Sequence, residues 1–124
     1  MSYRVFISST VKDIDLARDL AHRLESAGIK VNSGKPAVES ISSKINRELS
    51  SADEVFVILT KESINNSHVM FEIGAASSLR KRITPVVVGL KPSSVPSLIR
   101  NLKYINYADL EGYIADLEKR AKAA

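Results

Sequence analysis

Hydrophobic and polar positions along the chain follow two alternating periods. Short apolar runs typical of strands are separated by segments whose apolar residues recur every three or four positions, as in amphipathic helices. The predicted strands are Tyr3–Ser8, Ile29–Asn32, Glu54–Thr60, Thr84–Leu90 and Tyr104–Tyr107. The segment Glu54–Thr60 is apolar on both faces, which favours the centre of a parallel sheet.

The segments between and after these strands are predicted helices, marked by Leu16–Leu24, Ile41–Leu49, Asn65–Arg80, Pro96–Leu102 and Leu110–Ala121. A polar loop at Ser33–Pro36 follows the second strand. Strict alternation with short connections predicts an α/β fold of the three-layer, flavodoxin-like kind. We expect residues 1–124 to form one domain, with a five-stranded parallel sheet covered by helices on both faces.

Composition narrows the classes of function. The chain has 124 residues, of which 44% are hydrophobic, enough for one ordinary core. It has no cysteine and two histidines, so we expect no disulfide, no thiol catalysis and no metal. We also expect no bound cofactor. No apolar run of signal-peptide length follows the start, and runs such as Val55–Leu59 are far too short to cross a bilayer. We therefore expect a cytoplasmic protein with no membrane partner.

The net charge of +4 raises the question of a polyanionic partner. The basic clusters Arg80–Arg82 and Lys119–Lys122 fall near predicted helix C-termini, where the helix dipole favours cations. Zinc-finger spacing and an RNP-like aromatic motif are both missing from the sequence. We therefore predict no nucleic-acid partner.

Ligands of such sheets gather at the carboxyl ends of the strands, where several familiar sites are excluded. The loop Ser8–Asp13 has no glycine, so it forms neither a Walker loop nor a dinucleotide-binding fingerprint. A response-regulator receiver needs acidic residues after the first and third strands, but Ser8-Ser9 and Thr60-Lys61 stand there. A Gly-x-Ser-x-Gly nucleophile turn is also absent from the sequence.

Glu72 is the most informative single residue. At 100° per residue it falls between Leu79 and Ala76 on a helix face that Val69 and Ile73 complete. A carboxylate on an apolar face is costly unless something pairs with it. A capping box is excluded, because Val69 stands where Ser or Thr is required. Three interpretations remain: a satisfied core carboxylate, a slightly rotated helix with Glu72 at the solvent rim, or a catalytic group at the ligand end of the sheet.

Several segments together resemble bacterial TIR (Toll/interleukin receptor) domains. Val5–Ser9 followed by Asp13 is similar to the first TIR box, and Ala52–Thr60 looks like the central TIR strand. Asn66–Ala76, which contains Glu-Ile-Gly-Ala-Ala, resembles the segment Ser-x-Trp-Val-x-x-Glu-x-Gly-x-Ala and is the most specific part. Ile83–Val88 resembles the strand that follows it. The likeness spans roughly residues 3–90.

The resemblance implies a reaction and its participants. In active TIR domains the glutamate of this segment is catalytic, which carries that role to Glu72. The reaction is cleavage of the nicotinamide–ribose bond of NAD, so NAD is a substrate, and the setting is bacterial anti-phage signalling with TIR–TIR self-association. The candidate substrate-binding residues are Ser8, Ser9, Thr10, Lys35 and His68. For Ser8, Ser9, Thr10 and Lys35 the alternative is ordinary loop polarity.

Two departures from the TIR pattern keep other functions open. His68 stands where the family usually has Trp, and the loop at residues 33–40 lacks the usual Pro-Gly-Asp/Glu pattern. These departures favour a non-enzymatic TIR module that binds other TIR domains. A further alternative is a nucleoside deoxyribosyltransferase-like enzyme, which has a related α/β layout and also uses a glutamate at an N-glycosidic bond.

Overall fold

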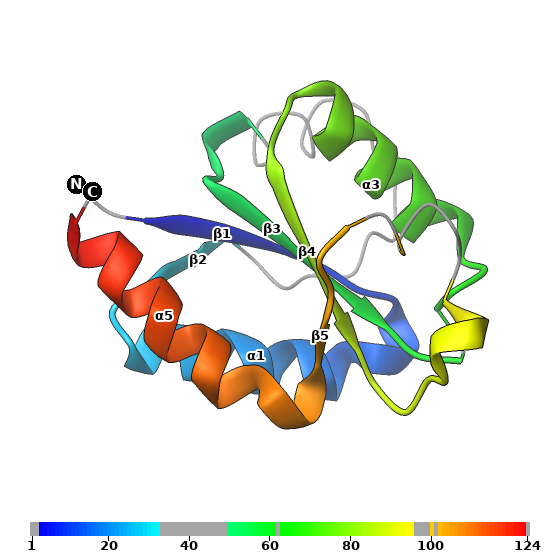
Figure 1. The fold of residues 1–124 in the computed structure, drawn as a ribbon. Helices are drawn as coiled ribbons and strands as arrows, with labels where there is room; N and C mark the ends of the chain where they lie inside the picture. The colour runs from blue at the N-terminus through cyan, green and yellow to red at the C-terminus, as the bar shows by residue number, and fades with distance from the viewer. Residues whose placement is uncertain (1–2, 33–49, 62, 96–99, 101, 124) are drawn as a thin grey trace.

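The computed structural model describes residues 3–32, 50–61, 63–95, 100 and 102–123. Its five-stranded sheet has the order β2-β1-β3-β4-β5, and each pair of neighbouring strands is parallel (Figure 1). The strands are β1 (Arg4–Ser8), β2 (Lys30–Asn32), β3 (Glu54–Leu59), β4 (Arg82–Val87) and β5 (Ile105–Asn106). The predicted five-stranded parallel sheet is confirmed.

Helices cover both faces of this sheet (Figure 1). Helices α1 (Ile14–Ser26) and α5 (Leu110–Ala123) lie on one face, and α3 (Ser67–Ser78) lies on the other. Short 3-10 turns η1 (Val11–Asp13), η2 (Pro92–Ser94) and η3 (Tyr107–Asp109) connect the elements. This is the predicted three-layer α/β architecture. The predicted helix at residues 41–49 and most of that at 96–102 lie outside the described residues.

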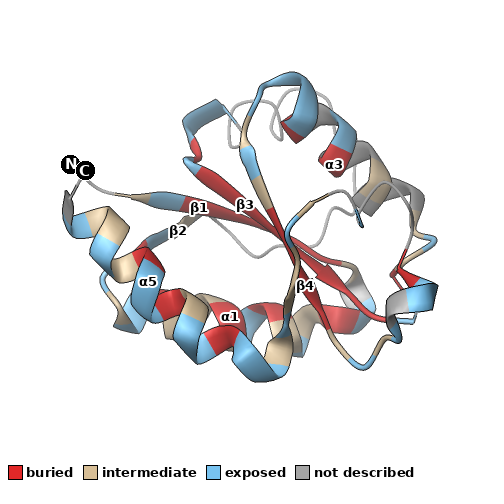
Figure 2. Cartoon of the chain, viewed as in Figure 1, coloured by how far each residue is buried: buried red, intermediate tan, exposed pale blue. Residues whose placement is uncertain are grey.

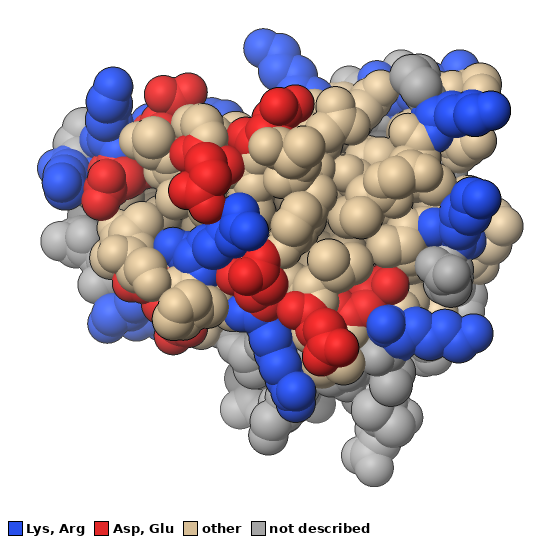
Figure 3. Space-filling view, turned by 90° about the horizontal axis from the view of Figure 1, so that it is seen from below, with Lys and Arg blue, Asp and Glu red and all other residues tan. Residues whose placement is uncertain are grey.

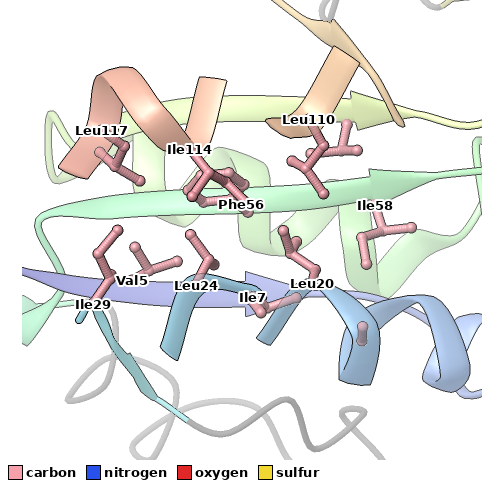
Figure 4. Close-up of a cluster of buried hydrophobic side chains, with 12 residues drawn as sticks. Val5, Ile7, Leu20, Leu24, Ile29, Phe56, Ile58, Leu110, Ile114 and Leu117 are labelled. Carbon is pink, nitrogen blue, oxygen red and sulfur yellow. The ribbon is translucent and has the colours of Figure 1, made fainter. Parts of the chain in front are cut away.

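The core has two halves, one on each side of the sheet (Figure 2). Strand β3 is buried along its whole length, and its side chains alternate between the halves. Figure 4 shows the half beneath α1 and α5, a cluster that includes Leu20 and Leu24 of α1, Leu117 of α5 and Phe56 of β3. Burial of apolar area in both halves holds the three layers together.

The predicted end of the third helix is wrong by two residues. The helix stops at Ser78, and Arg80 adopts a left-handed φ of 58°. The Arg80 N–H donates to the Ser77 carbonyl and the Lys81 N–H to the Ala76 carbonyl, each at 3.0 Å. These two bonds form a Schellman cap, which usually has glycine at the left-handed position. Arg80 occupies that position here, so the glycine that usually marks such a helix end is missing from the sequence.

The early stop also corrects the predicted apolar face of α3. Ile73 and Ala76 are buried, at 1% and 0% exposure, as predicted. Leu79 is 41% exposed, so its assignment to the buried face is wrong. It lies beyond the last helical residue, and the chain there already turns towards β4.

The exposure of Leu79 predicts that its truncation has little effect on stability. Leu79→Ala removes most of a side chain but should change the free energy of unfolding by less than about 0.5 kcal/mol, because Leu79 is 41% exposed and belongs to neither half of the core. Ile73→Val removes a single methylene, yet should cost about 1 kcal/mol, since Ile73 is buried. Urea denaturation of both variants measures the difference. A larger loss for Leu79→Ala than for Ile73→Val would contradict the placement.

Charges of both signs are interspersed over the outer face of α1 and α5 (Figure 3). Arg23 of α1 bridges the two helices, with its guanidinium 3.0 Å from Asp19 and 2.9 Å from Glu111. The Tyr107 hydroxyl donates to Asp19, and burial followed by this hydrogen bond raises the pKa of Tyr107 to about 12. This face therefore carries no field of a single sign. Among the described residues, no helix has the length and apolar character needed to span a membrane.

Candidate functional site at the carboxyl edge of the sheet

The strand order creates a switch point between β1 and β3. The chain passes from β1 outward to β2 and then returns to β3 on the other side of β1. Helices α1 and α3, which follow β1 and β3, consequently lie on opposite faces of the sheet (Figure 1). The loops after these strands diverge at the carboxyl edge, the usual place for a ligand in open α/β sheets.

The first of these loops contains three predicted substrate-binding residues, Ser8, Ser9 and Thr10. Ser8 ends β1 two residues after Phe6 and therefore shares its face, and the side chain of Phe6 belongs to the core half under α3. Ser8 is therefore on the face of the sheet that α3 covers. Ser8 and Ser9 are buried, at 1% and 7% exposure, and Thr10 is half-buried. The structure brings these residues to the expected edge, and their role in binding stays a prediction.

A buried carboxylate, Asp13, joins the two loops. Its side chain, 5% exposed, accepts hydrogen bonds from the hydroxyls of Thr10 and Thr60. The Thr60 Oγ1 atom lies 3.1 and 3.0 Å from the two carboxylate oxygens, and the Thr10 Oγ1 atom lies 3.1 Å from Oδ2. Within the described ranges no cation forms an ion pair with Asp13. Neutral hydroxyls therefore satisfy this carboxylate.

The second loop is held by Ser63, which is fully buried. Its hydroxyl accepts the Thr60 N–H at 2.7 Å and donates to the Ile58 carbonyl at 3.2 Å. Backbone bonds from Ile64 to Thr60 and from Asn66 to Ser63 complete a compact turn. The Met70 N–H then bonds to the Asn66 carbonyl, so the turn leads directly into α3. These hydrogen bonds connect the turn to the end of β3 on one side and to the start of α3 on the other.

Helix α3 carries the predicted catalytic residue. Glu72 occupies its second turn, about 7.5 Å along the axis from Ser67 at about 1.5 Å per residue. It precedes the buried Ala76 by four residues, and so stands one turn nearer the carboxyl edge on the same side of the helix. His68 is in the first turn. The side chains of Glu72 and His68 and the whole of Lys35 lie outside what the structure describes.

A second buried carboxylate, Glu54, lies at the opposite edge of the sheet, at the start of β3. Its Oε1 accepts the Tyr3 hydroxyl at 2.7 Å, and its Oε2 accepts the hydroxyls of Thr84 and Tyr113. Arg120 lies 3.7 Å from Oε1 and donates to the Tyr113 hydroxyl at 3.0 Å. Burial, and then the bond to Glu54, raise the pKa of the Tyr113 phenol, which therefore stays a donor at neutral pH.

Sequence reasoning did not assign roles to Asp13, Thr60, Ser63 or Glu54. Asp13 was one position of the first-box resemblance, and Thr60 served only to exclude a phosphoacceptor. For Asp13, Thr60 and Ser63 the available signal was their location in loops after buried parallel strands, which meet at one sheet edge. Glu54 begins β3 and therefore lacks that signal. No local pattern indicates that Asp13 and Glu54 are buried, since their hydrogen-bond partners are distant in sequence. The described residues include no cluster of three or more potential ligands for a metal ion.

A sequence model of the TIR domain family matches residues 5–122. This chain therefore belongs to the TIR domain family. The match includes the carboxyl-edge loops, α3 and the helix that carries Arg120. A search of curated proteins finds no matching sequence.

Solved structures show the same fold at low sequence identity. The TIR domain of the Toll-related receptor TRR-2 from Hydra magnipapillata is 18% identical, with a TM-score of 0.75 and coverage of 98% of this chain and 99% of that one. The CMP N-glycosidase BcmB from Clostridium botulinum is 22% identical, with a TM-score of 0.67 and coverage of 94% and 98%. The TIR domains of the activated Roq1 resistosome are 18% identical, with a TM-score of 0.64 and coverage of 98% and 84%.

Proposed function

We propose that this protein is an NAD glycohydrolase or cyclase that breaks the nicotinamide–ribose bond of NAD, with Glu72 as the catalytic residue. One observation carries the proposal. In a chain of the TIR family, Glu72 stands in the second turn of the helix that follows the central strand at the ligand edge of the sheet. The Glu-Ile-Gly-Ala-Ala segment around it is the part of the sequence most similar to bacterial TIR domains.

The chemistry suits a single carboxylate. The bond between ribose C1′ and the nicotinamide nitrogen breaks, and its electron pair goes to the nicotinamide ring, which leaves as a neutral molecule. Positive charge then develops on the ribose, where a carboxylate stabilises it. Water adds to C1′ and releases a proton to solvent, or a nucleophile within the ADP-ribose closes a ring. Because the leaving group is already cationic in NAD, no strong general acid is needed.

The other participants follow from this assignment. Ser8, Ser9 and Thr10 would hydrogen-bond ribose or phosphate, Lys35 would meet the pyrophosphate, and His68 would stack on a ring in place of the family Trp. The Thr10 hydroxyl donates to Asp13, so towards a substrate Thr10 would act as an acceptor. We further propose cytoplasmic bacterial defence signalling, with activation by TIR–TIR self-association and NAD as substrate rather than cofactor.

The structural neighbours support this class of reaction. BcmB is by its name an N-glycosidase of CMP, so a chain of this fold can break an N-glycosidic bond of a nucleotide. Its identity of 22% limits the likeness to the fold, and the substrate of the present chain is our proposal. CMP and deoxynucleosides are accordingly the competing substrates to test beside NAD.

A second candidate is a non-enzymatic TIR module that signals by binding other TIR domains. His68 in place of the family Trp favours it, because imidazole offers a smaller surface for nicotinamide. Fold likeness to the TIR domain of a receptor is also consistent with an interaction role. Homotypic binding without turnover of any nucleotide, under conditions that force assembly, would select this candidate.

The test is nicotinamide release from NAD, measured by HPLC across protein concentration. We expect release per protein molecule to rise with concentration, because assembly would complete the site. CMP and deoxynucleosides in parallel incubations distinguish the N-glycosidases. Turnover of either competitor with intact NAD would reject the NAD assignment, and release strictly proportional to protein would reject dependence on assembly.

A further inference from the structure

We propose that Asp13 is a positioning residue, which through Thr60 fixes the helix carrying Glu72 relative to the first loop. This inference rests on the proposed function and deepens it. It gives Asp13 and Thr60 a part in positioning Glu72, which the proposed function does not assign to them. Its basis is a buried carboxylate at the switch point, bonded to hydroxyls from the loops that follow β1 and β3.

The hydrogen bonds form a continuous connection between the two loops. Thr10 and Asp13 belong to the segment that joins β1 to α1, and their side chains bond to each other. Thr60 directly follows β3, and its hydroxyl bonds to both oxygens of Asp13. Ser63 ties Thr60 back to the strand at Ile58 and on into the turn before α3. The first loop and the start of α3 are thus joined by side chains as well as by the sheet.

The connection lies where the fold would otherwise let the loops separate. The elements α1 and α3 leave on opposite faces of the sheet (Figure 1), so their loops diverge beyond the last β1–β3 pair, Ser8 and Val57. Asp13 spans this divergence. A substrate held by Ser8 and Ser9 would meet Glu72 from a different element, and beyond the last β1–β3 pair the bridge holds the two elements at a set separation.

The inference predicts a change in turnover more than in binding. Without the Thr60 hydroxyl, the first loop still binds the substrate, but α3 is no longer fixed against it. Stabilisation of the developing positive charge then falls, which lowers kcat, while ground-state binding and KM change little. Small displacements of a reacting group can cost about 100-fold in rate, so we expect about a tenfold loss for a loosened bridge.

The chain provides a matched control. Thr84 and Thr60 are both buried, and each donates a hydroxyl to a buried carboxylate, Glu54 and Asp13 respectively. Thr60 follows the carboxyl end of β3, whereas Thr84 lies within β4 and bonds to Glu54 at the amino end of β3. The substitutions T60V and T84V therefore make the same chemical change in similar surroundings. T60S keeps the hydroxyl and should restore activity.

The experiment measures nicotinamide release and amide hydrogen exchange for the wild type, T60V, T60S and T84V. We expect T60V to lower kcat about tenfold with KM within about threefold, T60S to stay within about twofold of wild type, and T84V to leave kcat unchanged. Exchange at Ile64, Asn66 and Met70 should rise in T60V alone, because their turn loses its bridge. If T60V does not fold, T60A removes the same hydroxyl with a smaller side chain and replaces it.

The two readouts separate the proposals. A wild type that releases no nicotinamide overturns the proposed function, and hydrogen exchange then tests the bridge by itself. A T60V protein with wild-type kcat overturns the positioning role. Equal rises in exchange for T60V and T84V, or none in either, overturn the bridge.

Discussion

Glu72→Gln is expected to lower nicotinamide release from NAD by about 100-fold or more, the usual effect of removing one group that stabilises transition-state charge. The substitution nearly preserves size and removes the negative charge. Positive charge on the ribose would then face a neutral amide in place of a carboxylate. Because charge develops only as the bond breaks, the loss should fall on kcat, with KM changed much less.

The control for this prediction is Glu25→Gln, the same chemical change on an exposed residue near the end of α1. It should leave turnover unchanged. Both variants should unfold within about 0.5 kcal/mol of the wild type if Glu72 makes no buried ion pair. Wild-type turnover in Glu72→Gln would remove the catalytic assignment, and a large stability loss would favour the satisfied core carboxylate that the sequence left open.

Glu54→Ala is expected to lower the free energy of unfolding by about 3 kcal/mol or more, since it leaves buried donors without an acceptor. The carboxylate binds the hydroxyls of Tyr3, Thr84 and Tyr113, which belong to the N-terminal segment, β4 and α5. Its truncation also opens a cavity beside Phe56, whose ring contacts that of Tyr113 edge-on. Urea denaturation, with the m-value monitored, measures the loss.

Two further variants provide smaller losses of stability with which the loss for Glu54→Ala can be compared. Glu54→Gln keeps an acceptor for Thr84 and Tyr113 but turns a donor towards Tyr3, so we expect a smaller loss of about 1–2 kcal/mol. Glu111→Ala removes a surface ion pair with Arg23, whose glutamate is 75% exposed, and should cost less than about 0.5 kcal/mol. Losses of equal size for Glu54→Ala and Glu111→Ala would show that the buried network contributes little.

Most of the fold was predictable because the spacing of apolar residues and the alternation of strands with helices can be read along the sequence. The strand Glu54–Thr60 was placed at the centre of the sheet from its apolar run, and β3 occupies that position with every side chain buried. The helix containing Leu20 and Leu24 was predicted from spacing, and both residues are buried. Leu79 was misplaced because a left-handed Arg80 ended the helix without the glycine that usually marks such a cap.

The candidate site was predictable only in part. The loop at Ser8–Thr10 and Glu72 were predicted as site residues. A polar loop after a strand and a carboxylate on an apolar helix face can both be recognised from the sequence alone. It did not lead to the Asp13–Thr60 bond, whose partners are 47 residues apart, nor to the Tyr113–Glu54 bond across 59 residues. Which polar groups meet across such separations depends on how the strands are ordered, and periodicity does not encode that order.

The amino-acid sequence was enough for the class of fold, the parallel sheet and the family resemblance, because these depend on residue periods and short motifs. The three-dimensional arrangement was needed to show that Asp13 and Glu54 are buried and hydroxyl-bonded at opposite edges of the sheet. A carboxylate tolerates burial only where partners from other elements surround it, and folding alone brings those partners together.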